Sequence, residues 1–85
     1  MSVEVPKTGT LMRTRTQRLF YEGDDFLNLL SMPRDTAFVV IDMVSSERIA
    51  SLGVFKMIKM LLDDGRVGYV PIHDLRHFEK IEDPP

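Results

Sequence analysis

An Asp-Gly pair between two apolar runs is the feature that most restricts how this chain can fold. The runs are VFKMIKMLL at 54–62 and RVGYVPI at 66–72, and Asp63-Asp64-Gly65 lies between them. Glycine accepts positive φ at little cost, so Asp-Gly in this place is typical of the tight turn of a β-hairpin. The sequence therefore predicts two antiparallel strands joined at residues 63–65.

Three further segments are predicted to be strands. Residues 10–21 alternate with a period of two, residues 37–44 form a β-branched run, and a short strand follows a single helical turn near 73–75. Residues 26–30 fit either a strand or one helical turn, and 45–53 fit a short helix or an ordered loop. The sequence thus predicts five strands, with one short insertion between the second and the third.

Length and composition predict a single domain. The chain has 85 residues, no cysteine and 44% apolar residues, which suits one modest core without disulfides. We expect a flexible arm at 1–9, the domain at 10–81 and a disordered tail at 82–85. Five short strands on so small a chain predict a mainly all-β fold that forms a closed or nearly closed barrel, because closure removes exposed sheet edges.

Residues 61–75, LLDDGRVGYVPIHDL, resemble the end of a Src-homology-3-like barrel. Asp64, Gly65, Gly68, Tyr69 and Pro71 carry the resemblance, within a strand, tight turn, strand, helical turn and last strand in the family's order. The resemblance implies a small five-stranded SH3-like barrel. In that family a proline-rich peptide lies across an aromatic groove.

The chain departs from the family in the groove itself. It has no tryptophan, and Asp74 stands where the family's groove tyrosine follows the proline. Phe20, Tyr21 and Pro71 remain as candidates for part of such a surface. The resemblance therefore carries over to the fold better than to peptide recognition.

A basic first strand provides a second candidate surface. Arg13, Arg15 and Arg18 follow Lys7 within the first 20 residues, where Glu4 is the single acidic residue. Arginine forks suit phosphates or carboxylates, and Phe20 or Tyr21 would stack on a base. The alternatives are a solvated strand face, or charges that protect an edge from unwanted pairing.

No catalytic or metal site is predicted. His73 and His77 are four residues apart with Asp74 between them, but no third ligand is evident for a metal pair. The acidic pairs at 24–25 and 63–64 lie in turns, where carboxylates stay hydrated and unsuited to acid–base catalysis. We therefore expect no enzyme activity and no cofactor.

The sequence favours a non-catalytic interaction or assembly module, such as a small accessory or viral structural subunit. It would dock through a barrel edge or the N-terminal arm, onto a protein partner or a second copy of itself. A nucleic-acid-binding accessory protein is the alternative. The cytoplasm, or a virion if the source is viral, is the expected location, and no membrane span is expected. The candidate binding residues are Arg13, Arg15, Arg18, Phe20, Tyr21, Tyr69 and Pro71.

Overall fold

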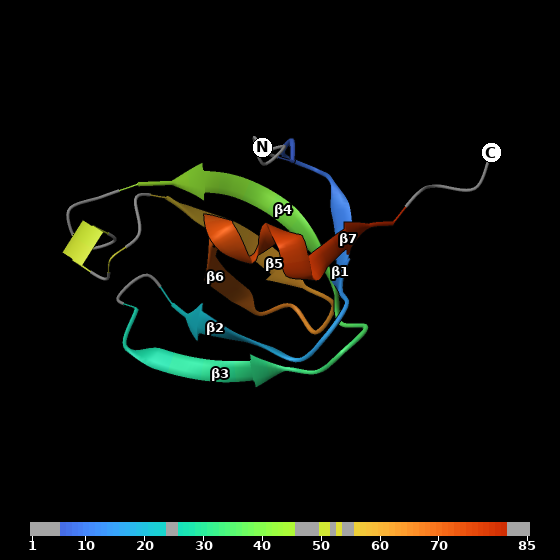
Figure 1. Cartoon of the computed structure of the whole chain (residues 1–85), viewed down its shortest axis with the longest axis horizontal. Helices are drawn as coiled ribbons and strands as arrows, with labels where there is room; N and C mark the ends of the chain where they lie inside the picture. The colour runs from blue at the N-terminus through green and yellow to red at the C-terminus, as the bar shows by residue number, and fades with distance from the viewer. Residues whose placement is uncertain (1–5, 24–25, 46–49, 52, 54–55, 82–85) are drawn as a thin grey trace.

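The structure, a computed structural model, describes residues 6–23, 26–45, 50–51, 53 and 56–81. Within them the chain is mainly β, with one antiparallel sheet in the order β3-β2-β6-β5-β4-β1-β7 (Figure 1). The 3₁₀ helix η1 at Ile72–His77 connects the last two strands. No helix in this part of the chain has the length and hydropathy needed to cross a membrane. The strands are β1 Leu11–Thr14, β2 Arg18–Glu22, β3 Asn28–Met32, β4 Ala37–Val44, β5 Met57–Leu62, β6 Val67–Pro71 and β7 Phe78–Lys80.

The hairpin predicted at residues 63–65 is confirmed. β5 and β6 pair antiparallel, and Gly65 has a φ of 89°. Its N–H donates to the carbonyl of Leu62 at 3.0 Å, and the N–H of Leu62 donates to the carbonyl of Arg66 at 2.8 Å. The Asp64 carboxylate accepts from the N–H of Arg66 at 3.0 Å, and this backbone hydrogen bond is the main cause that lowers the pKa of Asp64. The turn is therefore held by local chemistry.

The prediction of a mainly β fold is confirmed, but the predicted five strands are wrong in number and the sheet is not closed into a barrel. Residues 10–21, predicted as one strand, form β1 and β2, and the segment left open at 26–30 forms β3. This gives seven strands in the part of the chain that the structure describes. The end strands β3 and β7 do not pair with each other, so the sheet stays open.

Buried Thr14 marks the place where the predicted first strand divides. Its hydroxyl donates to the carbonyl of Pro33 at 2.8 Å and accepts from the N–H of Thr36 at 3.0 Å. β1 ends there, paired with β4 and β7. The chain then crosses to begin β2, which pairs with β3 and β6. The hydroxyl of Thr14 thus ties the end of β1 to residues 33–36.

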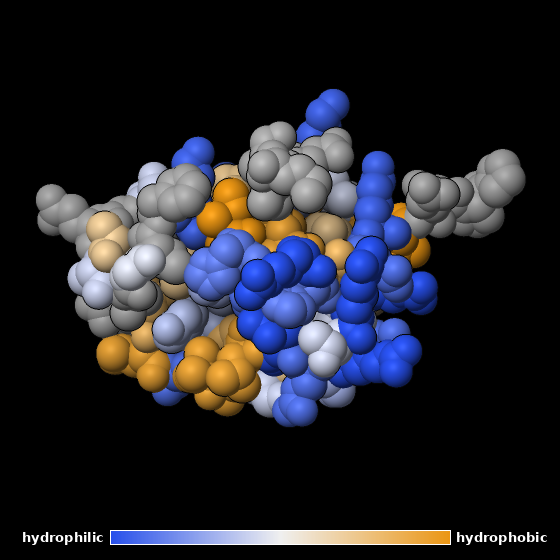
Figure 2. Space-filling view, in the orientation of Figure 1, coloured by the Kyte–Doolittle hydropathy of each residue, from blue (hydrophilic) through white to orange (hydrophobic). Residues whose placement is uncertain are grey.

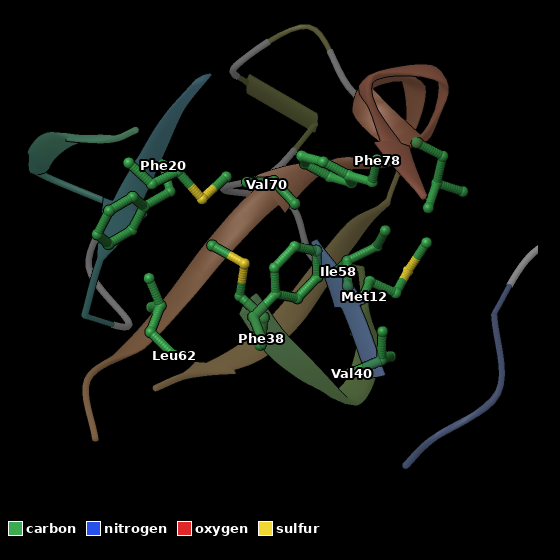
Figure 3. Packing of buried hydrophobic residues seen from close by; sticks show 11 residues of the cluster. Met12, Phe20, Phe38, Val40, Ile58, Leu62, Val70 and Phe78 are labelled. Atoms are coloured by element: carbon green, nitrogen blue, oxygen red, sulfur yellow. The ribbon is translucent and has the colours of Figure 1, made fainter. Parts of the chain in front are cut away.

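The sheet curls around one core although its edges do not meet. A single buried cluster includes Met32 from the β3 edge and Phe78 from the β7 edge, which a flat sheet would keep far apart. The rings of Phe38 and Phe78 meet edge to face at 5.1 Å (Figure 3). The buried members of the cluster are Met12, Phe20, Met32, Phe38, Val40, Ile58, Met60, Leu62, Val70, Leu75 and Phe78.

A bulge in β4 adjusts which of its residues face this core. Val40 pairs with Met60, but the next pair joins Asp42 to Lys59, so Ile41 is an extra residue. An extra residue shifts the alternation of a strand by one position. Met43 therefore packs against the main core, as Phe38 and Val40 do before the bulge.

Several predicted segments lie partly or wholly outside the described residues. The insertion at 45–53 is described at Ser45, at 50–51, which are helical, and at Gly53. Of the predicted arm, residues 6–9 are described, and the N–H of Gly9 donates to the carbonyl of Val40 at 2.7 Å. Residues 1–5 and the predicted tail at 82–85 fall outside the description. The helical turn predicted near 73–75 lies within η1 and is confirmed.

Candidate binding surface

A shallow hollow of about 370 Å³ lies where the start of β2 approaches the junction of β6 and η1. Leucine, tyrosine and proline side chains give it an apolar wall, and an arginine with a carboxylate gives it a charged side. Such a mixture of apolar surface with a few polar groups is typical of binding sites. The lining residues are Gln17, Arg18, Leu19, Tyr21, Leu29, Pro71, His73 and Asp74.

The alternation of β2 places its side chains on two faces. Phe20 points into the core with no exposed surface, so Leu19 and Tyr21 lie on the opposite face, beside the hollow. Gly68 on β6 allows this, because a Cβ there would lie 2.5 Å from Cδ2 of Phe20. The glycine of the Gly-Tyr-Val-Pro run thus makes room for the core phenylalanine.

Pro71 turns the chain from β6 into η1 and brings the second side of the hollow into place. It has φ −60° and ψ 145°, which is extended backbone suited to proline, and η1 begins at the next residue. Asp74 is buried in η1, and His73 next to it is exposed. The short helix therefore sets these two polar residues against the start of β2.

An ion pair joins the two sides of the hollow. Nη2 of Arg18 donates to Oδ1 of Asp74 at 2.9 Å, and the Asp74 side chain is 7% exposed. Nε2 of His73 lies 3.8 Å from the same carboxylate oxygen. The Nε of Arg18 is buried and makes no hydrogen bond among the described residues. On this side of the hollow the positive charge of Arg18 is therefore balanced by the carboxylate of Asp74.

Two half-exposed leucines extend the apolar wall outward. Leu19 on β2 is 51% exposed and Leu29 on β3 is 50% exposed. Leu29 pairs with Tyr21 across the strands, so the three side chains share one face. Figure 2 shows apolar side chains gathered over the β2–β3 part of the molecule. An apolar surface on paired strands, next to a hollow, is a feature of interaction sites.

An aromatic cluster that includes Phe26, from the connection between β2 and β3, packs against Tyr21 on this face. The ring of Phe26 meets Tyr21 edge to face at 6.0 Å and Tyr69 at 5.0 Å. Phe26 holds a φ of 56°, a conformation that a bulky residue seldom adopts. The Nζ of Lys59 lies 5.8 Å from the centre of the Tyr69 ring. These contacts fix the orientation of Tyr21 at the edge of the hollow.

The structure brings together three of the seven residues predicted to bind. Arg18, Tyr21 and Pro71 line the hollow. Tyr69 pairs with Tyr21 across the strands but is 4% exposed, so it supports the surface from within. Phe20 has no exposed surface and belongs to the core.

Arg13 and Arg15 lie away from the hollow, next to β7. Nε of Arg13 donates to Oε1 of Glu79, its cross-strand partner, and Nε of Arg15 lies 3.8 Å from the other oxygen of that carboxylate. One acidic side chain thus faces both arginines. The three arginines of the predicted stripe therefore divide between two carboxylates, those of Glu79 and Asp74.

Leu19, Leu29 and Asp74 were missed as site residues by the sequence reasoning. Leu19 alternates with Phe20, a signal that one of the two faces outward, but the pattern does not say which. The sequence shows Asp74 in place of the family's groove tyrosine, but it does not show that Arg18 is the partner of Asp74. That partner is 56 positions away in the chain, beyond the reach of any local pattern.

The two histidines of η1 are held by different neighbours. Nε2 of His77 accepts from Nε of Arg76 at 3.2 Å, and His73 faces Asp74. Burial, then the charges of Arg18 and Arg76, lowers the pKa of His77. Within the described residues no three His, Asp or Glu side chains are grouped as metal ligands would be.

Comparison with known proteins adds no relative to this description. No protein-family model, curated protein or solved structure matches the chain.

Proposed function

We propose that this chain is a non-catalytic protein-interaction module that binds through the hollow and the leucines beside it. The observation that carries the proposal is the position of Leu19 on β2 and Leu29 on β3, each about half exposed and on the same face of the strand pair as Tyr21. Burying such side chains against a partner removes apolar surface from water, the main driving force of association.

An SH3-like assignment of the fold is part of this proposal. The succession of hairpin, β6, η1 and β7 supports it, since the family has these elements in the same order. The open sheet with seven strands is a difference from the expected barrel. The fold assignment therefore rests on the order of elements around Gly65 and Pro71.

Asp74, which stands where the family has its groove tyrosine, argues for a ligand other than a proline-rich helix. In the family a tyrosine at this place offers its flat ring to proline. Here the side chain is a buried carboxylate held by Arg18. The exposed apolar groups are instead leucines on strands, which suit the apolar side chains of an extended segment or of another sheet.

The nucleic-acid alternative gains less support from the geometry. Arg13 and Arg15 share Glu79, and Arg18 is engaged by Asp74. A groove that follows a phosphate backbone is positively charged, and the carboxylates beside these arginines offset that charge. The protein-interaction proposal therefore takes precedence.

Selection from a displayed library of random peptides tests the proposal. Peptides enriched on the wild-type chain should lose roughly tenfold or more in affinity for Leu19→Asp or Leu29→Asp, since a buried leucine contributes about 1.5–3 kcal/mol. Leu61→Asp is the matched control, because Leu61 is 40% exposed on β5 but does not line the hollow. Far-ultraviolet circular dichroism checks that each variant folds.

Two results would count against the proposal. One is a wild-type chain that enriches no peptide and stays monomeric at the highest soluble concentration. The other is equal loss of binding in Leu61→Asp and Leu19→Asp, which would place the surface elsewhere on the sheet.

A further inference from the structure

The ion pair at the side of the hollow leaves hydrogen-bonding capacity unused. Oδ1 of Asp74 accepts from Nη2 of Arg18 at 2.9 Å. The other carboxylate oxygen, Oδ2, accepts no hydrogen bond from the residues that the structure describes. The Asp74 side chain is only 7% exposed, so water has little access to it. A buried carboxylate oxygen without a donor costs free energy, and a ligand that brings a donor recovers part of that cost.

Arg18 offers donors beside this acceptor. A guanidinium carries several N–H groups in a fixed plane, and the bond to Asp74 uses one of them. Nε of Arg18 is buried without a partner, and the guanidinium makes no second hydrogen bond to the described residues. Arg18 and Asp74 both line the hollow. A ligand group that donates one hydrogen bond and accepts another therefore suits the pair.

The charges at the hollow favour a neutral group. Arg18 and Asp74 balance each other, so a cation bound there would face Arg18 and an anion would face Asp74. Nε2 of His73 lies 3.8 Å from the same carboxylate oxygen and adds a cation when it is protonated. A further charge would lose its hydration without finding a free counter-charge. Hydroxyl and amide groups meet this condition, whereas ammonium, guanidinium and carboxylate groups do not.

The apolar wall favours an aromatic body behind that neutral group. The side chains of Leu19, Tyr21, Leu29 and Pro71 line the same hollow, whose volume of about 370 Å³ leaves room for one aromatic ring. Aromatic rings bury a large apolar area, and they pair with other rings edge to face or offset. Tyr21 is itself positioned by the ring of Phe26, 6.0 Å away. The wall thus offers a preformed surface on which a ring can lie.

We infer that the hollow binds a tyrosine side chain of a partner protein, with the ring on the apolar wall and the hydroxyl on the ion pair. The inference rests on the proposed function and names the chemistry of its ligand. The phenol hydroxyl donates to the carboxylate of Asp74 and accepts from an N–H of Arg18. Tryptophan only donates, phenylalanine does neither, and serine, threonine and asparagine lack the ring.

Nuclear magnetic resonance titration of the full chain with N-acetyltyrosinamide and N-acetylphenylalaninamide tests the inference. The two probes differ only in the hydroxyl. The tyrosine probe should bind about tenfold more tightly, because it makes a hydrogen bond to a charged group that the phenylalanine probe leaves unmade. It should shift the backbone amide signals of Leu19, Leu29 and Asp74. Equal or tighter binding of the phenylalanine probe would overturn the inference.

A pair of acid-to-amide variants locates the preference. Asp74→Asn replaces the carboxylate with a weaker, neutral acceptor of similar shape, so the preference for tyrosine should fall to about twofold or less. Glu79→Gln is the matched control, because Glu79 faces Arg13 and does not line the hollow, and it should keep the full preference. An unchanged preference in Asp74→Asn would assign the hydroxyl to another site and refute the inference. Should Asp74→Asn fail to fold, the comparison of the two probes on the wild-type chain still decides.

The outcomes separate this inference from the proposed function. Suppose that the wild-type chain enriches displayed peptides that Leu19→Asp loses, but that replacing tyrosine by phenylalanine in those peptides changes nothing. The tyrosine ligand is then refuted and the interaction module stands. A wild-type chain that binds neither peptide nor probe removes the two proposals together.

Discussion

The guanidinium of Arg18 on β2 donates to the carboxylate of Asp74 in η1 at 2.9 Å, and this ion pair fastens the short helix to the first part of the sheet. Asp74 is 7% exposed, and Arg18 is 31% exposed. A buried carboxylate depends on its charged, hydrogen-bonded partner to replace the water that it has lost. The pair therefore matters for stability and for the shape of the hollow that it borders.

Removing Arg18 should destabilise the fold. Arg18→Ala leaves Asp74 buried without its partner, at an expected cost of about 2 kcal/mol in the free energy of unfolding, discounted because the arginine is partly exposed. Urea denaturation gives this number. Arg34→Ala is the control, because Arg34 and Asp35 are exposed and 3.9 Å apart, and it should cost less than about 0.5 kcal/mol. Equal losses of unfolding free energy in the two variants would show that the buried ion pair stabilises the fold no more than the exposed one does.

Adding one methyl group at Gly68 should strain the core. Its Cβ would lie 2.5 Å from Cδ2 of Phe20 and 3.2 Å from Cε of Met60, and Phe20 is fully buried. We expect Gly68→Ala to lower stability by about 1–3 kcal/mol. Thermal unfolding followed by circular dichroism measures the loss.

A second change tests the cause of that strain. Phe20→Leu removes the ring atoms that the new methyl group meets, so the double variant should lose less stability than the two single losses added together. Additive losses would mean that the methyl group acts somewhere other than at Phe20.

The low pKa of His77 predicts a pH dependence. Burial, and the nearby charges of Arg18 and Arg76, lower this pKa from 6.5. Below pH 6.5 the unfolded chain takes up the proton more readily than the folded chain, so the stability should fall as the pH drops from 6.5 toward the folded pKa. Above 6.5 this contribution is constant.

Nuclear magnetic resonance of the imidazole checks the assignment. The titration midpoint of His77 should lie below 6.5 in the folded protein, and Arg76→Gln should move it upward by removing one of the cations. A midpoint at or above 6.5 in the wild type would contradict the prediction.

The divided arginines predict little affinity for nucleic acid. Since Glu79 faces Arg13 and Arg15, a mixed-sequence oligonucleotide should not change the mass seen by light scattering, even at low salt. Glu79→Gln removes the carboxylate that faces both arginines, so this variant should bind the oligonucleotide more tightly than the wild type does. A wild-type mass shift that disappears in salt and in Arg13→Glu would instead support the nucleic-acid alternative.

Local chemistry was enough to predict some elements. The hairpin at Gly65 follows from one residue that accepts positive φ between two apolar runs. The strand at 37–44 follows from an unbroken β-branched run, and the turn of η1 follows Pro71. Each of these depends on residues within a few positions of one another, so a single sequence contains the signal.

The tertiary structure alone decided the division of residues 10–21 and the make-up of the surface. The alternation there continues through both β1 and β2, but the first strand ends at Thr14, whose hydroxyl bonds to Pro33 and Thr36, about 20 positions away. The partner of Asp74 is farther still. Strand neighbours and buried ion pairs are set by contacts between distant parts of the chain, and a periodic pattern records only which side of a strand a residue takes, not what it meets.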